Sequence, residues 1–147
     1  MKAAFLFNFA RYVEWPASAF TAAEAPVRIC VLGARTFASV VEEVVAGKQV
    51  GERSVEVAEA QDLDRAARCH ILFVGEDLGI ERPQLISTLA DAHVFTVSDS
   101  EGFAREGGVA NFFRADQKMR FEINTGAAKR AGLKISSRLL RLARVVE

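Results

Sequence analysis

The stretch VRICVLG at residues 27–33 decides the fold class of this chain. A short apolar run that ends at a glycine is typical of a strand buried on both faces. The same pattern returns in CHILFVG at residues 69–75. Apolar and polar residues alternate at 54–58, which predicts a further strand that has one wet face or lies at an edge.

Helical patterns stand between these strands. Residues 37–45 place apolar side chains at helical spacing, and we expect this helix to begin with Thr36 as its N-cap and to stop at Gly47. Residues 85–89 predict another helix with Pro83 near its first turn. A strand at 93–98 follows. Strands that alternate with helices are the pattern of parallel βαβ units.

The pattern changes after Asp99. Residues 109–113 and 118–124 predict a hairpin joined through 114–117. In its second strand, Phe121 and Ile123 should point to the face opposite Glu122.

We expect residues 136–146 to close the chain as a helix, with Arg138, Arg141 and Arg144 in a row on one side. This row is either a solvated face or a partner-binding face. The pattern contains no internal repeat and no linker. We therefore predict one α/β domain over residues 1–147, with a mostly parallel open sheet flanked by helices and an antiparallel hairpin at one edge.

Composition narrows the function classes. The chain has 147 residues, of which 50% are hydrophobic, and 19 basic residues balance 19 acidic ones. This composition excludes a disordered tail, and the lack of a basic excess argues against a general nucleic-acid binder. No apolar run approaches the ~20 residues that span a bilayer.

The start of the chain has two interpretations. A cation before an apolar stretch resembles a signal peptide, but Asn8 and Arg11 interrupt the stretch. We favour a folded amphipathic helix that ends near Glu14, before Pro16. Its apolar stripe would consist of the side chains at helical spacing, namely Phe5, Phe9, Tyr12 and Val13.

Leu6, Phe7 and Trp15 lie outside that stripe, so the sequence does not indicate what these apolar side chains pack against. Because large exposed apolar patches are rare on isolated soluble domains, these side chains should meet either the C-terminal helix or a second molecule. We expect contact with a second copy, and hence a homodimer. Phe7 and Trp15 are accordingly candidate partner contacts, together with Glu122.

Motifs for catalysis are missing. The turn at 33–37 lacks the glycines of a dinucleotide fingerprint and the Lys of a phosphate loop, and no GxSxG occurs. Neither His70 nor His93 stands at a metal-ligand spacing. We therefore expect no enzyme activity, no catalytic residue, no cofactor and no metal site.

A ligand pocket is the alternative that the architecture suggests. Ligands of open α/β sheets bind beyond the carboxyl ends of the strands. That edge should carry Arg35, Glu76, Ser98 and Asp99. Turn geometry and helix capping explain the same residues equally well. Cys30 and Cys69 are also open to two interpretations, because free thiols are usual in the cytosol and a disulfide is usual outside it.

Several phrases in order resemble the YfiR-like family, over nearly the whole chain. They are KAAFLFNFA (2–10) with VEWP (13–16), ICVLG (29–33), CHILFV (69–74), TVSD (96–99) with GFA (102–104), GG (107–108), RFEIN (120–124), and AGLKISS (131–137) with LL (139–140).

The resemblance implies a periplasmic, non-enzymatic regulator. The best-known members of the family hold an inner-membrane diguanylate cyclase inactive through its periplasmic sensor region, and other relatives serve other membrane sensors. An outer-membrane lipoprotein often releases them. Family members are made with a signal peptide, so we expect this chain to be a mature domain with an added Met1. The second, more C-terminal cysteine pair of the family is missing here.

The resemblance also places both cysteines outside the cytosol. Since their two similar strands should be neighbours in the sheet, we predict a Cys30–Cys69 disulfide. Two functions remain: a repressor that binds a membrane signalling protein, and a sensory module that binds a small ligand. A sealed surface at the strand ends favours the first function. An open pocket lined by Arg35, Glu76 and Asp99 favours the second.

Overall fold

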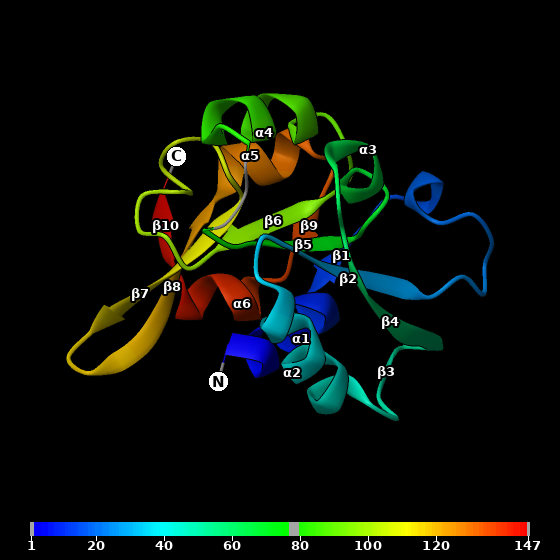
Figure 1. The fold of residues 1–147 in the computed structure, drawn as a ribbon. Helices are drawn as coiled ribbons and strands as arrows, with labels where there is room; N and C mark the ends of the chain where they lie inside the picture. The colour runs from blue at the N-terminus through cyan, green and yellow to red at the C-terminus, as the bar shows by residue number, and fades with distance from the viewer. Residues whose placement is uncertain (1, 77–79, 147) are drawn as a thin grey trace.

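The computed structural model describes residues 2–76 and 80–146, and it shows one α/β domain built on an eight-stranded sheet (Figure 1). The strand order is β10-β8-β7-β6-β5-β2-β4-β3. The strands are β2 (Val27–Leu32), β3 (Gln49–Val50), β4 (Arg53–Glu59), β5 (Ile71–Val74), β6 (Phe95–Ser98), β7 (Ala110–Ala115), β8 (Lys118–Asn124) and β10 (Arg144–Val146).

Most neighbouring strands are parallel, as the sequence predicts. The parallel pairs run from β4 through β2, β5 and β6 to β7, and β10 is parallel to β8. The antiparallel pairs are β3 with β4 and the β7–β8 hairpin. A separate two-stranded sheet joins β1 (Val13–Glu14) to β9 (Lys134–Ile135).

Helices cover both faces of the sheet. On one face lie α1 (Lys2–Tyr12), α2 (Arg35–Val45) and α6 (Ser137–Leu142), and on the other lie α3 (Leu63–Ala66) and α4 (Arg82–Leu89) (Figure 1). The chain also contains the 3-10 turn η1 (Ala17–Ala19) and α5 (Thr125–Arg130). Each face therefore has its own apolar cluster.

The first helix is buried by its own chain. Its innermost side chains are Leu6 and Phe9, both fully buried, whereas Phe5 and Tyr12 are only half-buried. The buried face of the helix is therefore centred on Leu6 and Phe9, and the prediction of a stripe that includes Phe5 and Tyr12 but not Leu6 was wrong. Because α1 packs against the sheet and also contacts α2 and α6, the apolar surplus is covered within the chain.

The C-terminal helix is shorter than predicted. It ends at Leu142, and the chain continues as strand β10 beside β8. Two β-branched residues, Val145 and Val146, favour an extended chain, and the edge of β8 offers backbone partners. Arg144 consequently does not share a helix face with Arg138 and Arg141. The hairpin remains near this edge, with β10 as the outermost strand.

Two local predictions also needed correction. The second helix begins at Arg35 with Ala34 as its N-cap, so Thr36 is not the cap. Gly33, with φ +77°, already turns the chain before that point. The hairpin turn contains two residues rather than the four predicted at 114–117. These two, Asp116 (φ 53°) and Gln117 (φ 65°), both adopt positive φ, as a two-residue turn requires.

Candidate functional site

The carboxyl ends of the central strands are closed by two glycines. The amide of Gly75 donates a 2.7 Å hydrogen bond to the carbonyl of Leu32, and a Cβ on Gly75 would overlap the backbone of Gly33. Only glycine allows this approach. The loops after β2 and β5 therefore meet where an open α/β sheet would otherwise form its ligand crevice.

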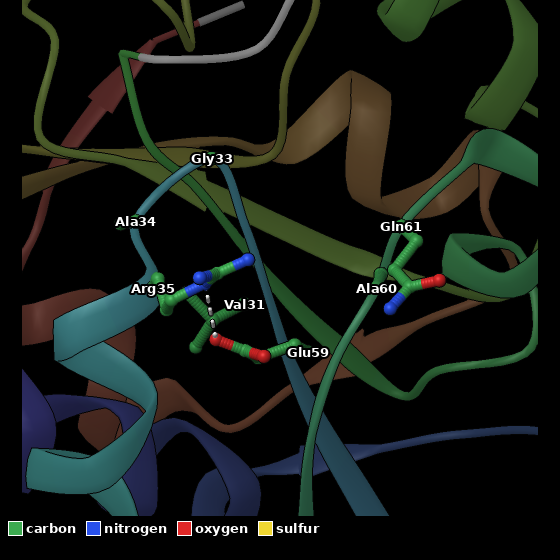
Figure 2. A pocket seen from close by; sticks show the side chains of 7 residues that line it. All are labelled: Val31, Gly33, Ala34, Arg35, Glu59, Ala60 and Gln61. Atoms are coloured by element: carbon green, nitrogen blue, oxygen red, sulfur yellow. Dashed lines mark ion pairs between the residues drawn. The ribbon is translucent and has the colours of Figure 1, made fainter.

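This contact separates the predicted pocket residues. Arg35 lies beside Gly33 and Glu59, as Figure 2 shows, and these residues line a hollow of about 330 Å³. The Nε of Arg35 lies 3.9 Å from a carboxylate oxygen of Glu59, and its side chain is 91% exposed. Such an exposed pair contributes little to stability or binding.

The other predicted pocket residues lie elsewhere. Glu76 and Ser98 line a second hollow of about 700 Å³ at the ends of β5 and β6. Asp99 lines neither hollow, since its carboxylate is paired at 2.7 Å with Nζ of Lys2 on α1. The structure thus brings together Glu76 and Ser98, but neither Arg35 nor Asp99 joins them.

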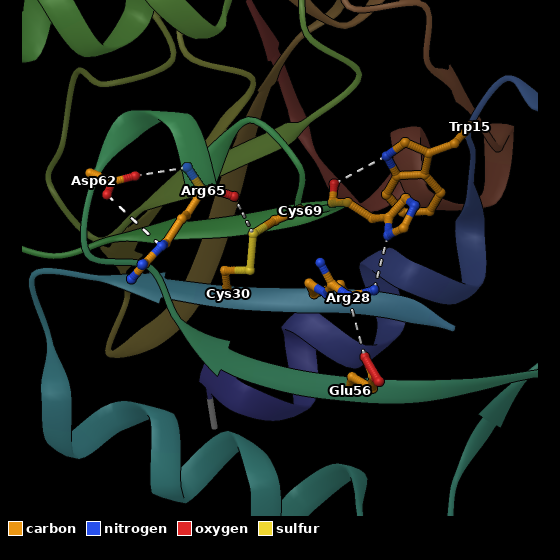
Figure 3. Close-up of a disulfide and its surroundings, with 8 residues drawn as sticks. Trp15, Arg28, Cys30, Glu56, Asp62, Arg65 and Cys69 are labelled. Atoms are coloured by element: carbon orange, nitrogen blue, oxygen red, sulfur yellow. Dashed lines mark hydrogen bonds and ion pairs between the residues drawn. A yellow bond between two sulfur atoms is a disulfide. The ribbon is translucent and has the colours of Figure 1, made fainter. Parts of the chain in front are cut away.

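The predicted disulfide is confirmed. Cys30 on β2 is bonded to Cys69, which lies just before β5, with a Cα–Cα distance of 6.0 Å (Figure 3). Both residues are buried beneath α3 and α4. The bond therefore fixes the short connection from α3 to the central strand.

His70 anchors the segment after α1 to the same region. Its Nδ1 accepts a hydrogen bond from the backbone amide of Arg28 at 2.9 Å, so its Nε2 carries the proton and donates to the carbonyl of Ala19, also at 2.9 Å. Phe20 stacks on the ring at 4.3 Å between centroids. Trp15 donates from its indole to the backbone carbonyl of His70 at 3.0 Å, as Figure 3 shows.

These contacts make His70 a neutral structural residue. Burial lowers its pKa, the hydrogen bond to Ala19 partly opposes that effect, and the charges of Arg28 and Arg53 lower the pKa further. Trp15, a candidate partner contact, is half-buried and engaged within the chain.

A buried carboxylate lies at the centre of a network of polar side chains. Glu122 on β8 is 2% exposed. Its Oε2 accepts hydrogen bonds from Arg105 at 3.1 Å and from Nε of Arg144 at 2.7 Å. Burial alone would raise the pKa of Glu122, but the two arginines outweigh it and lower the pKa below the ordinary 4.5.

Two buried asparagines extend this group. Asn111 accepts a hydrogen bond from the amide of Ala104, and Asn124 donates to the carbonyl of the same residue, both at 2.8 Å. The guanidinium of Arg144 also lies 4.0 Å from the ring centroid of Phe113. The network fastens the loop before β7 and the last strand, β10, onto the hairpin.

Sequence reasoning named Glu122 but not its partners. The helical pattern at 136–146 predicted Arg144 on a helix face rather than beside Glu122. The available signal was the presence of Asn111 and Asn124 at strand positions that should be apolar, since buried polar groups need partners. Glu122 itself is inaccessible, so a partner protein would meet the guanidinium groups of Arg105 and Arg144, whose side chains are 60% and 53% exposed.

Phe7 is half-buried at the edge of the core. The ammonium of Lys48 lies 5.1 Å from its ring centroid. Within residues 2–76 and 80–146, no three His, Cys, Asp or Glu side chains gather as metal ligands, and no helix there is long and apolar enough to cross a membrane.

Comparison with known families identifies the chain. The family model described as YfiR/HmsC-like matches residues 1–144. The chain belongs to the YfiR/HmsC-like family. This membership supports a regulatory role in the periplasm in general terms. No protein of curated function matches the chain by sequence.

Two solved structures share the fold. One is a conserved domain protein from Vibrio cholerae O1 biovar El Tor, with a TM-score of 0.62, 13% identity and 82% of this chain covered. The other is an ABC domain in complex with L-Trp from Streptococcus pneumoniae, with a TM-score of 0.55, 14% identity and 84% covered. The chain spans 55% of the length of each. At these identities the likeness concerns the fold alone.

Proposed function

We propose that this protein is a periplasmic regulator that acts by contact. It binds the periplasmic sensor region of an inner-membrane signalling protein, with a diguanylate cyclase as the target class, and holds that protein inactive. An outer-membrane lipoprotein is the partner that would release it. The observation that carries this proposal is the match of the YfiR/HmsC-like family over residues 1–144.

Two structural features support a role through contact. The buried Cys30–Cys69 disulfide suits an oxidising compartment such as the periplasm. The contact between Gly33 and Gly75 divides the strand ends into separate hollows, so the polar residues there do not converge on one reacting atom. This arrangement favours a protein-binding regulator over an enzyme.

The Glu122 group offers a contact surface. Because its carboxylate is buried, Arg105 and Arg144 are held in fixed positions with their outer faces in water. Preorganised arginines are frequent anchors of protein interfaces, because less side-chain entropy is lost on binding. We place the partner contact at these two arginines.

Reconstitution tests the proposal. A full-length diguanylate cyclase from the same organism, with its periplasmic region, would be placed in liposomes with the purified chain, and product formation would be measured. The parent chain should inhibit the cyclase. Arg105→Ala should inhibit at least about tenfold more weakly, which is the loss expected from a contact of about 1.4 kcal/mol. Arg65→Ala, which removes an exposed arginine on α3, serves as the matched control and should inhibit like the parent.

Failure to inhibit any membrane-bound cyclase of the organism would contradict the proposed target. Equal inhibition by Arg105→Ala and the parent would contradict the proposed surface alone. Circular dichroism of each variant must show the parental fold, so that a loss of inhibition reports contact rather than unfolding.

The hollow lined by Glu76 and Ser98 supports a second candidate, a sensory module for a small ligand. Its volume of about 700 Å³ lies within the range of ligand pockets. Two carboxylates, Glu76 and Glu81, line it together with Arg82, which is already paired with Glu106 at 2.9 Å, so the hollow suits a ligand that carries an amino group. An amino acid that raises the melting temperature of the parent chain, but not of Glu76→Ala, would support this alternative.

Self-association remains a proposal. The burial of Leu6 within the chain means that a second copy is not needed to cover α1. Sedimentation of the parent as a dimer, and of Phe7→Glu as a folded monomer, would support an interface at the exposed edge of Phe7. A monomeric parent would exclude the homodimer.

A further inference from the structure

The charges of this neutral chain are segregated along its length. Residues 105–144 contain ten Lys and Arg but only three Asp and Glu. The rest of the chain carries the opposite excess, because the whole has 19 of each sign. Such asymmetry between parts of a chain points to an anionic partner for the basic part.

The fold concentrates part of this excess at one edge of the sheet. The β7–β8 hairpin projects beyond the body of the domain, and α6 and β10 lie beside its base (Figure 1). Five exposed cations stand on these elements. We name them, together with Leu142 and Val145, the basic edge; the cations are Arg114, Lys118, Arg120, Arg138 and Arg141.

These five cations have no carboxylate partner within the described part of the chain. The ion pairs found there involve other arginines and Lys2, including the Arg105 and Arg144 pairs with Glu122. The basic edge thus differs from α3, where Arg65 pairs with Asp62. Its charge is available to an external group.

Apolar side chains lie exposed among the cations. Leu142 is 71% exposed and Val145 is 48% exposed, and within residues 2–76 and 80–146 only Val40 joins them as an exposed large apolar residue. On α6, Arg138, Arg141 and Leu142 are neighbours, because residues three and four apart share a helix face. Leu139, on another side of the helix, is buried in the core. The helix therefore presents two arginines and a neighbouring leucine to water.

We propose that the basic edge docks on an anionic phospholipid surface. Arginine heads would meet lipid phosphates while Leu142 and Val145 enter the boundary of the acyl chains. This inference does not depend on which membrane protein the chain regulates. It would place the regulator on the same surface as any target embedded there.

The shape of the basic edge favours a membrane over an acidic protein. Its cations stand on a surface helix and on a projecting hairpin, where Arg114 lies on one face and Lys118 and Arg120 lie on the other, and none of them lines the hollows at the strand ends. A fluid array of phosphates can pair with cations at any spacing, whereas an acidic protein would need carboxylates at matched positions.

Vesicle co-sedimentation tests this inference. The probes are vesicles of pure phosphatidylglycerol and of pure phosphatidylcholine, with the whole chain at low and at high salt. The parent should bind the anionic vesicles, bind more weakly at high salt, and not bind the neutral ones. Arg138→Gln/Arg141→Gln should bind about 25-fold more weakly, at about fivefold for each cation removed.

The control changes the total charge equally at a different place. Arg65→Gln/Arg68→Gln removes two exposed cations around α3 and should bind like the parent. Leu142→Ser keeps every charge and should lose the binding that survives at high salt. Equal weakening by the control pair, equal binding to neutral vesicles, or no binding to anionic vesicles would each overturn the inference. Binding of polyglutamate without binding of vesicles would overturn it in favour of an acidic protein.

Discussion

Replacing Glu122 with alanine should destabilise the fold, because this carboxylate holds two arginines and the last strand. It is 2% exposed and accepts hydrogen bonds from Arg105 and Arg144. A hydrogen bond to a charged group contributes about 1.5 kcal/mol or more. Two such bonds contribute about 3 kcal/mol. The arginine side chains are 60% and 53% exposed, so water solvates them once the carboxylate is removed, and the expected loss of unfolding free energy is about 2–3 kcal/mol.

Urea unfolding measures this loss. The midpoint of Glu122→Ala should fall, while Glu42→Ala, which removes an exposed carboxylate on α2, should stay within about 0.5 kcal/mol of the parent. A Glu122→Ala protein as stable as that control would refute the reasoning, because it would mean that the buried ion pairs contribute nothing net.

The pH dependence of Glu122 gives an independent check. Its pKa is lower in the folded chain than the ordinary 4.5, so the unfolded chain binds more protons between the two values. The stabilisation is present above pH 4.5 and is lost as the pH falls through the folded pKa. Glu122→Gln should therefore lose less stability than the parent on acidification below that pH.

Three further predictions concern other parts of the fold. Opening the Cys30–Cys69 bond, which joins residues 39 apart, should cost about 4 kcal/mol in the chain-entropy model, and two reactive thiols in denatured, unreduced protein would contradict the bond. Phe121→Ala should cost about 3–5 kcal/mol, because its ring is buried at 5.2 Å from that of Phe9, and equal urea midpoints for variant and parent would show that the packing is wrong. The pKa of His70 lies below its ordinary 6.5, so the stability that the neutral side chain provides is complete above pH 6.5 and declines as the pH falls through the folded pKa. If a His70→Gln protein lost stability over the same pH range, the decline would belong to another group.

Local patterns predicted the parallel half of the sheet well. VRICVLG and CHILFVG form β2 and β5, because a continuous apolar run fits a strand covered by helices on both sides. Their adjacency in the sheet, with Ile29 opposite Ile71, also made the disulfide foreseeable.

Contacts between residues far apart in the chain could not be predicted from local sequence patterns. Val145 and Val146 follow a helical pattern, and their pairing with the open edge of β8 makes them a strand. The division of the predicted pocket depends on the contact of Gly33 with Gly75, residues far apart in the chain. The sequence also predicted Asp99 in the pocket, because its ion-pair partner Lys2 lies 97 residues away along the chain.

The central claim, repression of a membrane diguanylate cyclase by contact, is tested most directly by the cellular level of cyclic di-GMP. The level should rise when the gene for this chain is deleted from its native organism, and it should return to normal when the parent chain is supplied in the periplasm. An unchanged level after deletion, in cells shown to produce the parent chain, would contradict the claim.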